Sequence, residues 1–91
     1  MVKKMIATPT QFKLYAPKAK KVSLAGDFNK WSTKEHAAKK DTKGNWSTKI
    51  ALKPGKYEYK FIVDGNWLND PSNNMVITNT YGTQNSIIEI K

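Results

Sequence analysis

Apolar and polar residues alternate along most of this chain, in short runs that end at turn-forming residues. The clearest run is residues 57–63, where Tyr57, Tyr59, Phe61 and Val63 are separated by single residues. A period of two places alternate side chains on opposite faces of a strand, whereas a helix needs a period near 3.6. No stretch carries the helical period over an ordinary helix length. The alternation therefore restricts the chain to an all-β fold of short antiparallel strands.

Asp64-Gly65 directly follows this run and has the residues of a two-residue β-hairpin turn of type I′. We therefore expect a short strand carrying Trp67 to fold back beside residues 57–63. Strand parity places Lys60 on the face opposite the aromatic residues of its strand. The hairpin is thus expected to bring Trp67 near Lys60, outside the core.

The other runs are bounded in the same way by proline, glycine and asparagine. We expect strands at residues 11–15, 21–28, 46–52, 57–63, 75–78 and 84–90, with a short one at Trp67, and a long polar loop at residues 29–45. Six or seven short strands joined by turns are typical of an antiparallel β-sandwich with an immunoglobulin-like architecture.

Two sheets packed about 10 Å apart would enclose the inward-facing residues of these strands. The residues expected in this core are Phe12, Leu14, Val22, Leu24, Trp46, Ile50, Leu52, Tyr59, Phe61, Val63, Ile88 and Ile90.

A chain of 91 residues has enough surface to bury for one domain and too little for two. We divide it into an N-terminal extension, residues 1–10, and a β-sandwich domain, residues 11–91. The first nine residues contain neither a signal-peptide core nor a membrane-spanning segment. The sequence therefore predicts a cytoplasmic protein without a membrane partner.

The net charge of +9 raises the possibility of nucleic-acid binding, because basic surfaces neutralise phosphates. All sixteen basic residues are lysines, however, and none is an arginine, the residue best suited to bidentate contacts with guanine or phosphate. The lysines are dispersed along the chain, apart from a denser group at Lys18, Lys20 and Lys21. This pattern favours a solvated lysine-rich surface, with the denser group as a candidate local patch.

The sequence contains little that could support catalysis. His36 is the single histidine and lies in the expected polar loop, where a solvated side chain is the simplest expectation. Asp27, Asp64 and Asp70 lie next to turns, where each has a local structural role. The chain has no cysteine, phosphate loop, dinucleotide fingerprint or calcium loop. We therefore expect no catalytic residue, no metal site, no cofactor and no enzymatic activity.

Trp31 and Trp67 are each flanked by polar and turn-forming residues instead of an apolar run. Exposed indoles on a small rigid domain are typical of a binding surface. The alternative is a packing role, in which Trp31 caps the edge of the sandwich and Trp67 shields Ile62.

Three ordered blocks of sequence carry a family resemblance: VSLAGDFNKW at residues 22–31, PGKYEYKFIVDGNW at residues 54–67, and Asp70-Pro71. With these blocks the chain resembles carbohydrate-binding module family 48, and within it the glycogen-binding domains of AMP-activated protein kinase beta subunits. The resemblance extends over residues 11–91. It implies an early-set immunoglobulin-like β-sandwich that binds α-1,4-linked glucans such as glycogen, starch or maltooligosaccharides.

The resemblance also implies which residues contact the sugar. The two stacking tryptophans of the family match Trp31 and Trp67, and its sugar-contacting lysine matches Lys60. Its binding loop matches residues 81–85, which implies contacts from Thr83 and Asn85. The kinase subunits have leucine where this chain has Tyr81, which either adds a third stacking surface or caps the loop.

Two other function classes remain open beside glucan binding. The first is a docking module within a complex with a kinase or a glucan-metabolising enzyme, which would not require sugar binding. The second is a nucleic-acid binder that uses the lysine-rich surface. Salt separates nucleic-acid binding from glucan binding, because polyphosphate binding weakens steeply as salt rises whereas binding of a neutral glucan should hardly change.

Overall fold

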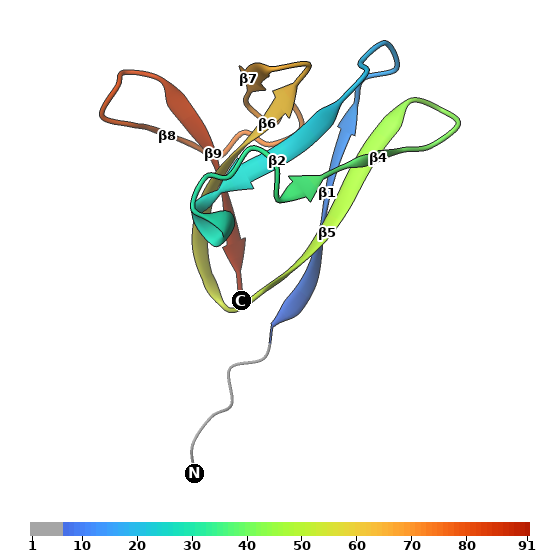
Figure 1. Cartoon of the computed structure of the whole chain (residues 1–91). Coiled ribbons are helices and arrows are strands. Elements are labelled where there is room, and N and C mark those ends of the chain that lie inside the picture. Colours follow the sequence, from blue (N-terminus) through green and yellow to red (C-terminus); the bar gives the residue numbers. More distant parts are fainter. Residues whose placement is uncertain (1–6) are drawn as a thin grey trace.

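The structure is a computed structural model that describes residues 7–91 (Figure 1). Residues 1–6 of the predicted N-terminal extension lie outside the described residues. The elements are β1 (Thr8–Tyr15), β2 (Val22–Gly26), the 3-10 helix η1 (Asp27–Asn29), β3 (His36–Ala37), β4 (Lys39–Lys40), β5 (Asn45–Leu52), β6 (Gly55–Val63), β7 (Asn66–Leu68), β8 (Val76–Thr78) and β9 (Gln84–Ile90).

The strands form two antiparallel sheets that face each other (Figure 1). The smaller sheet has the order β1-β5-β4, and the larger has the order β3-β2-β6-β9-β8. Strand β7 also pairs with β6, beyond the segment of β6 that pairs with β9. The predicted all-β, immunoglobulin-like antiparallel β-sandwich is confirmed.

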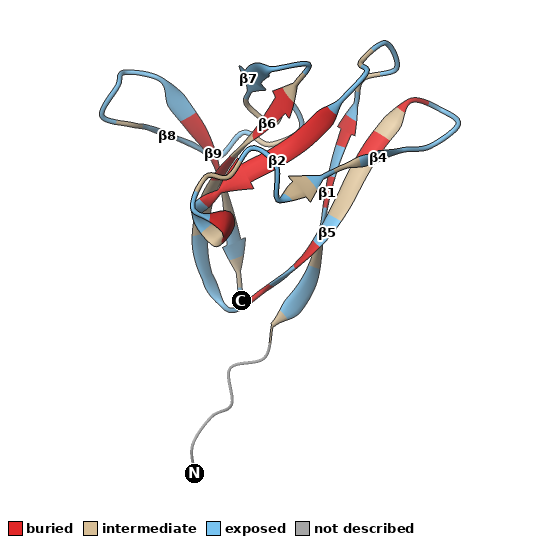
Figure 2. Ribbon diagram, in the orientation of Figure 1, coloured by how far each residue is buried: buried red, intermediate tan, exposed pale blue. Residues whose placement is uncertain are grey.

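The core lies between the two sheets, where buried residues follow the facing strands β1, β2, β5 and β6 (Figure 2). Nine of the twelve predicted core residues are buried, and the other three, Val63, Ile88 and Ile90, pack partly buried against them. At the centre of β6, Tyr59 and Phe61 are 2% and 1% exposed. The period-two pattern of the sequence therefore identified the core correctly.

The hairpin after β6 also agrees with the prediction. Asp64 and Gly65 both have positive φ, at 49° and 87°, as a type I′ turn requires. Asp64 additionally accepts hydrogen bonds from the backbone N–H groups of Lys20 and Lys21, at 2.9 and 2.8 Å. This turn therefore ties the loop between β1 and β2 to the end of β6.

The prediction of one long polar loop at residues 29–45 is wrong in part. It contains η1 at its start and two short strands, with β3 pairing with β2 and β4 pairing with β5. Each of these strands has two residues, too few to produce a recognisable alternation. Each nevertheless pairs along one side with a neighbouring strand and so forms an edge of its sheet.

The expectation of a solvated loop histidine is also wrong. His36 lies in β3 and is partly buried, with its ring edge-on to Phe28 at a centroid distance of 5.9 Å. Its Nδ1 accepts a hydrogen bond of 2.9 Å from Asn29 Nδ2. His36 therefore has a structural role beside the η1 turn. The two segments come together only in the folded chain.

A polar network anchors the segment after β7 to the larger sheet. The Tyr59 hydroxyl donates to Asp70 Oδ2 at 2.7 Å and accepts from Asn73 Nδ2 at 3.0 Å. Asn73 Nδ2 also donates to the carbonyl of Ile87, and Asp70 N–H donates to Ser86 Oγ. Burial, together with the bond to Asp70, raises the pKa of Tyr59 well above its ordinary value.

Replacing Tyr59 by phenylalanine tests this network. Tyr59→Phe removes one donor and one acceptor, so we expect the free energy of unfolding at neutral pH to fall by about 1–3 kcal/mol. Above about pH 10 the unfolded chain releases the tyrosine proton while the folded protein keeps it, so wild-type stability should fall as pH rises. The part of this alkaline loss of stability that comes from Tyr59 should be missing in Tyr59→Phe. Urea unfolding at neutral and alkaline pH measures both effects, and parallel pH profiles would contradict the second.

Candidate functional site

The outer face of β6 carries Lys60 and Ile62, on the side away from the core. Trp67 of β7 lies directly opposite Ile62 in the antiparallel register, and Ile62 is only 8% exposed. The position of Trp67 thus agrees with the predicted shielding of Ile62. Trp67 itself remains 50% exposed, so its packing role leaves an indole surface open to solvent.

Trp31 follows η1 in a backbone conformation that L-residues seldom adopt. Lys30 and Trp31 have φ of 54° and 60°, so two consecutive non-glycine residues are left-handed. Each such residue costs roughly 1–2 kcal/mol, and the cost persists only where the surrounding structure enforces it. Strain of this kind is concentrated at functional sites, which draws attention to Trp31.

Asn29 is the residue that enforces this turn. It is buried, and its Oδ1 accepts a hydrogen bond from Gly26 N–H at 3.0 Å. Its Nδ2 donates to the carbonyl of Leu24 at 3.0 Å and to His36 Nδ1. The backbone of Trp31 adds a bond to the carbonyl of Gly26, at 2.9 Å. The side-chain amide of Asn29 thus provides hydrogen-bond partners for the backbone N–H of Gly26 and the backbone carbonyl of Leu24 at the end of β2.

Asp27 connects the turn to the neighbouring strand. Its Oδ1 accepts from the indole Nε1 of Trp31 at 3.2 Å, and its Oδ2 accepts from Glu58 N–H of β6 at 2.9 Å. Gly26 permits this close approach, because a Cβ there would lie 2.5 Å from the carbonyl oxygen of Glu58. Asp27 therefore orients Trp31 against β6, in addition to its predicted role at the end of a strand.

The two tryptophans meet on this face of the larger sheet. Their ring centroids are 6.3 Å apart and their planes are inclined at 49°. We call this pair the tryptophan platform. Its two faces are inclined, so it presents a bent apolar surface instead of a single flat one.

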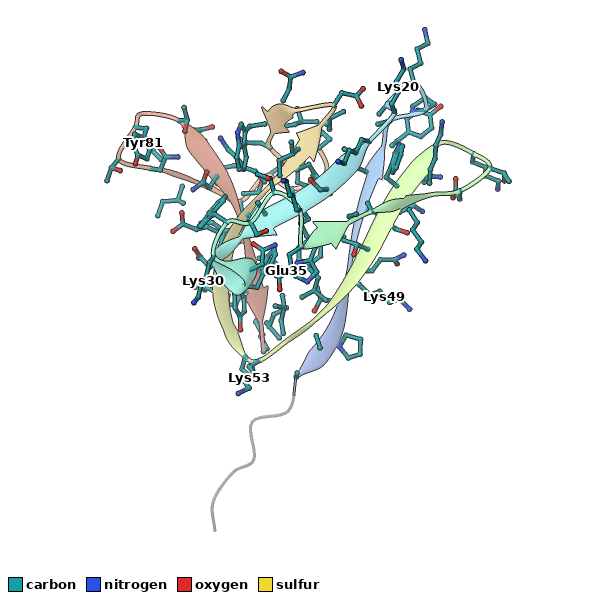
Figure 3. The ribbon with its side chains drawn as sticks, in the orientation of Figure 1. Lys20, Lys30, Glu35, Lys49, Lys53 and Tyr81 are labelled. Carbon is teal, nitrogen blue, oxygen red and sulfur yellow. The ribbon has the colours of Figure 1, made fainter. Side chains whose placement is uncertain are left out.

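The loop between β8 and β9 supplies the other side of the site, with Tyr81 at its tip (Figure 3). Tyr81 is 90% exposed, Thr83 is exposed, and Asn85 is 7% exposed at the start of β9. Gly82 has a φ of 84°, a conformation for which glycine is the default residue.

These parts enclose an open cleft with a volume of about 670 Å³. All six residues predicted from the family resemblance lie along it, and Glu58 and Asn79 lie there as well. The lining residues are Trp31, Glu58, Lys60, Trp67, Asn79, Tyr81, Thr83 and Asn85.

Sequence reasoning missed Glu58 and Asn79. Glu58 shares the outer face of β6 with Lys60, so strand parity contained the signal that could have identified it. Asn79 gave no such signal, because its place depends on how the loop closes. Its side chain bonds to the backbone of Tyr81 and to Thr83 and Asn85.

The cleft combines an exposed aromatic platform with a rim of amide, hydroxyl, ammonium and carboxylate groups. Glu58 and Lys60 have opposite charges, so this lining provides no excess of either sign. Aromatic faces pack against apolar C–H surfaces, and the rim groups can donate to and accept from hydroxyls. The arrangement suits an uncharged, hydroxyl-rich ring.

The denser lysine group lies elsewhere. Lys18, Lys20 and Lys21 are exposed in the loop between β1 and β2, and none of them lines the cleft. Across residues 7–91, no group of three or more histidine and carboxylate side chains is placed to hold a metal ion. The same part of the chain contains no helix with the length and apolar character needed to cross a membrane.

A β-sandwich with such an open aromatic cleft has the character of a carbohydrate-binding module. The family model described as the glycogen recognition site of AMP-activated protein kinase matches residues 8–91. The chain belongs to this family, and the predicted resemblance is confirmed. It is a glycogen-recognition domain.

Several curated proteins are similar to the chain. It is 39% identical over 89 residues to 5'-AMP-activated protein kinase subunit beta-1 of Sus scrofa, with 93% of this chain and 66% of that protein covered. It is 38% identical over 89 residues to subunit beta-1 of Homo sapiens, and 38% identical over 85 residues to subunit beta-2 of Mus musculus. Both matches cover 93% of this chain but 30% of those proteins.

Substitution of Lys30 tests the strained turn. Lys30 is exposed and left-handed, so Lys30→Gly is expected to raise the free energy of unfolding by up to about 1 kcal/mol, and Lys30→Val to lower it by about 1 kcal/mol or more. Lys34→Gly is the matched control, because Lys34 is exposed and has no positive φ. It should be slightly destabilising. Urea unfolding measures all three variants, and a Lys30→Val protein as stable as wild type would argue against strain.

Proposed function

We propose that the cleft binds α-1,4-linked glucans, such as glycogen, starch and maltooligosaccharides, without catalysing a reaction on them. In this proposal Trp31 and Trp67 stack on the faces of glucose rings, and Lys60, Thr83 and Asn85 form hydrogen bonds with the hydroxyls. The single observation that carries the proposal is that these residues, from four separate segments, line one cleft together.

The chemistry of glucose supports this assignment. A glucose ring exposes C–H groups on its faces and hydroxyls around its edge, which matches an indole surface bordered by polar groups. Since glucans are uncharged, Lys60 acts here as a hydrogen-bond donor to hydroxyl oxygens. A neutral ligand also explains why the cleft has no excess of positive charge although the whole chain carries +9.

The expected affinity of one site is modest. If each indole face loses roughly 80 Å² of apolar surface, two faces contribute about 4 kcal/mol before the cost of immobilising the ligand. With hydrogen bonds added, a single site should bind with a dissociation constant in the micromolar to millimolar range. A glycogen particle presents many chain ends, so retention on the polymer is expected to be stronger than this.

Tyr81 serves as a third stacking surface in this proposal. A tyrosine that capped its loop would be covered by it, whereas Tyr81 is 90% exposed and lines the cleft. An aromatic ring at this position extends the apolar surface beyond the tryptophan platform, toward a further sugar unit.

The relatives are kinase subunits, and the chain covers only part of each of them. We propose that the domain accompanies a kinase and brings it to glycogen in the cytoplasm. A partner enzyme of glucan metabolism is the alternative. The division between an extension at residues 1–10 and a domain at residues 11–91 stays a prediction.

Co-sedimentation with glycogen and calorimetric titration with a maltooligosaccharide series test the proposed function. The wild type should bind, and the double variant Trp31→Ala, Trp67→Ala should lose at least tenfold in affinity because it lacks both indole faces. Circular dichroism shows whether the variant is folded. Unchanged retention of a folded double variant would overturn the site, and absence of wild-type binding at millimolar ligand would favour a docking module.

Substitution of two lysines, one inside the cleft and one outside it, distinguishes glucan recognition from general electrostatic attraction. Lys60→Ala should weaken binding several-fold through the lost hydrogen bonds, whereas Lys49→Ala, on the exposed surface of β5, should leave it unchanged. Wild-type affinity for maltoheptaose should also hardly change between low and physiological salt. A steep loss with salt, or equal effects of both substitutions, would point to a charged ligand instead.

Substitutions of Tyr81 test the third stacking surface. Tyr81→Phe should retain wild-type affinity for long maltooligosaccharides, and Tyr81→Ala should weaken it about three- to tenfold, because the ring and not the hydroxyl makes the contact. The effect should shrink for the shortest ligands that the tryptophan platform already covers. Calorimetry with ligands of increasing length measures this, and equal loss at every length would argue for an indirect effect.

A further inference from the structure

We infer that Asn79 is a positioning residue of this site, whose amide decides that Thr83 and Asn85 present hydrogen-bond donors to the ligand. The inference rests on the proposed function and adds to it the direction of the hydrogen bonds. Under it, donors from three residues of the rim meet hydroxyl oxygens of the sugar, and the Glu58 carboxylate accepts from its hydroxyls.

The orientation of the Asn79 amide is determined by its backbone partners. Its Oδ1 lies 3.0 Å from Tyr81 N and 3.1 Å from Thr83 N, and backbone N–H groups can only donate. The other end of the amide is therefore Nδ2. It donates to Thr83 Oγ1 at 2.7 Å and to Asn85 Oδ1 at 3.3 Å.

These four bonds use the whole capacity of the amide, which has two acceptor lone pairs and two N–H groups. The backbone of Asn79 is engaged as well, since its N–H donates to the Thr83 carbonyl at 2.7 Å and its carbonyl accepts from Gly82 N–H at 3.1 Å. Although Asn79 lines the cleft, its side chain has no remaining group for a sugar. Its role is to hold the residues that do.

The bond from Asn79 determines what Thr83 can offer. A hydroxyl has one hydrogen and two lone pairs, and the Thr83 oxygen already accepts from Asn79 Nδ2. Its hydrogen is consequently directed away from Asn79. Thr83 is exposed and lines the cleft, so this hydrogen is available to a ligand.

Asn85 is held in one orientation from both ends. Its Nδ2 donates to Glu58 Oε1 at 3.0 Å, and its Oδ1 accepts from Asn79 Nδ2. An ionised carboxylate can only accept, so the amide of Asn85 cannot be reversed. One N–H of Asn85 then remains for the ligand. Together with the three N–H groups of Lys60, the rim presents donors, and Glu58 retains acceptor capacity beside them.

This arrangement defines the ligand that the rim selects. Sugar hydroxyls can accept from the donors of Lys60, Thr83 and Asn85 and can also donate to Glu58. An uncharged, hydroxyl-rich chain can therefore satisfy both the donors and the acceptor of this rim.

The decisive variant is Asn79→Asp, which has nearly the same shape. Aspartate still accepts from Tyr81 N–H and Thr83 N–H and so retains the loop, but it cannot donate. The Thr83 hydroxyl then donates its hydrogen to the new carboxylate and no longer to the ligand. We expect about five- to tenfold weaker binding of maltoheptaose by Asn79→Asp, with unchanged amide hydrogen exchange at Tyr81 and Thr83 and a small fall in the urea unfolding midpoint, because Asn85 Oδ1 loses its donor.

A double-mutant cycle with Thr83→Val separates this mechanism from a general disturbance of the loop. If Asn79 acts through the Thr83 hydroxyl, Asn79→Asp should have a clearly smaller effect in the Thr83→Val background than in wild type. Additive effects, or a wild-type affinity of Asn79→Asp, would overturn the inference while leaving the proposed function intact. Failure of the wild type to bind maltoheptaose would overturn both.

Discussion

Strand β6 is the element on which both the core and the site depend. One of its edges pairs with β2 and the other with β9 and β7, so its backbone is held along both sides. Because successive side chains point to opposite faces, its inner face contributes Tyr59 and Phe61 to the core while its outer face presents Glu58 and Lys60 to the cleft. The packing that stabilises the sandwich therefore also fixes the floor of the proposed glucan site.

The sides of the cleft are made by two turns that depend on asparagine amides. In one turn, Asn29 is buried and holds the strained backbone at Lys30 and Trp31. In the other, Asn79 organises the loop from Tyr81 to Thr83. An asparagine side chain can donate and accept at once, so it can replace missing backbone partners at a sharp turn. Hydrogen bonds within the domain therefore hold both halves of the site in place.

Preorganisation of this kind suits weak recognition of a repetitive polymer. A single site that covers a few sugar rings gains little apolar burial, so the affinity depends on avoiding the cost of ordering loops and side chains. Repeated contacts along glycogen can then increase retention without a tight individual site. Under the proposed function, weak single sites let the domain exchange between positions on one glycogen particle.

The sequence by itself determined the all-β fold, the twelve core residues and the outward direction of Lys60, because these follow from a period of two within single strands. It also marked the Asp64-Gly65 hairpin, whose turn chemistry is local. Only the tertiary structure decided the short strands β3 and β4, the partly buried hydrogen bond between His36 and Asn29, and the place of Asn79. Those features depend on hydrogen bonds between separated segments or on how a loop closes, and neither alternation nor turn propensity encodes them.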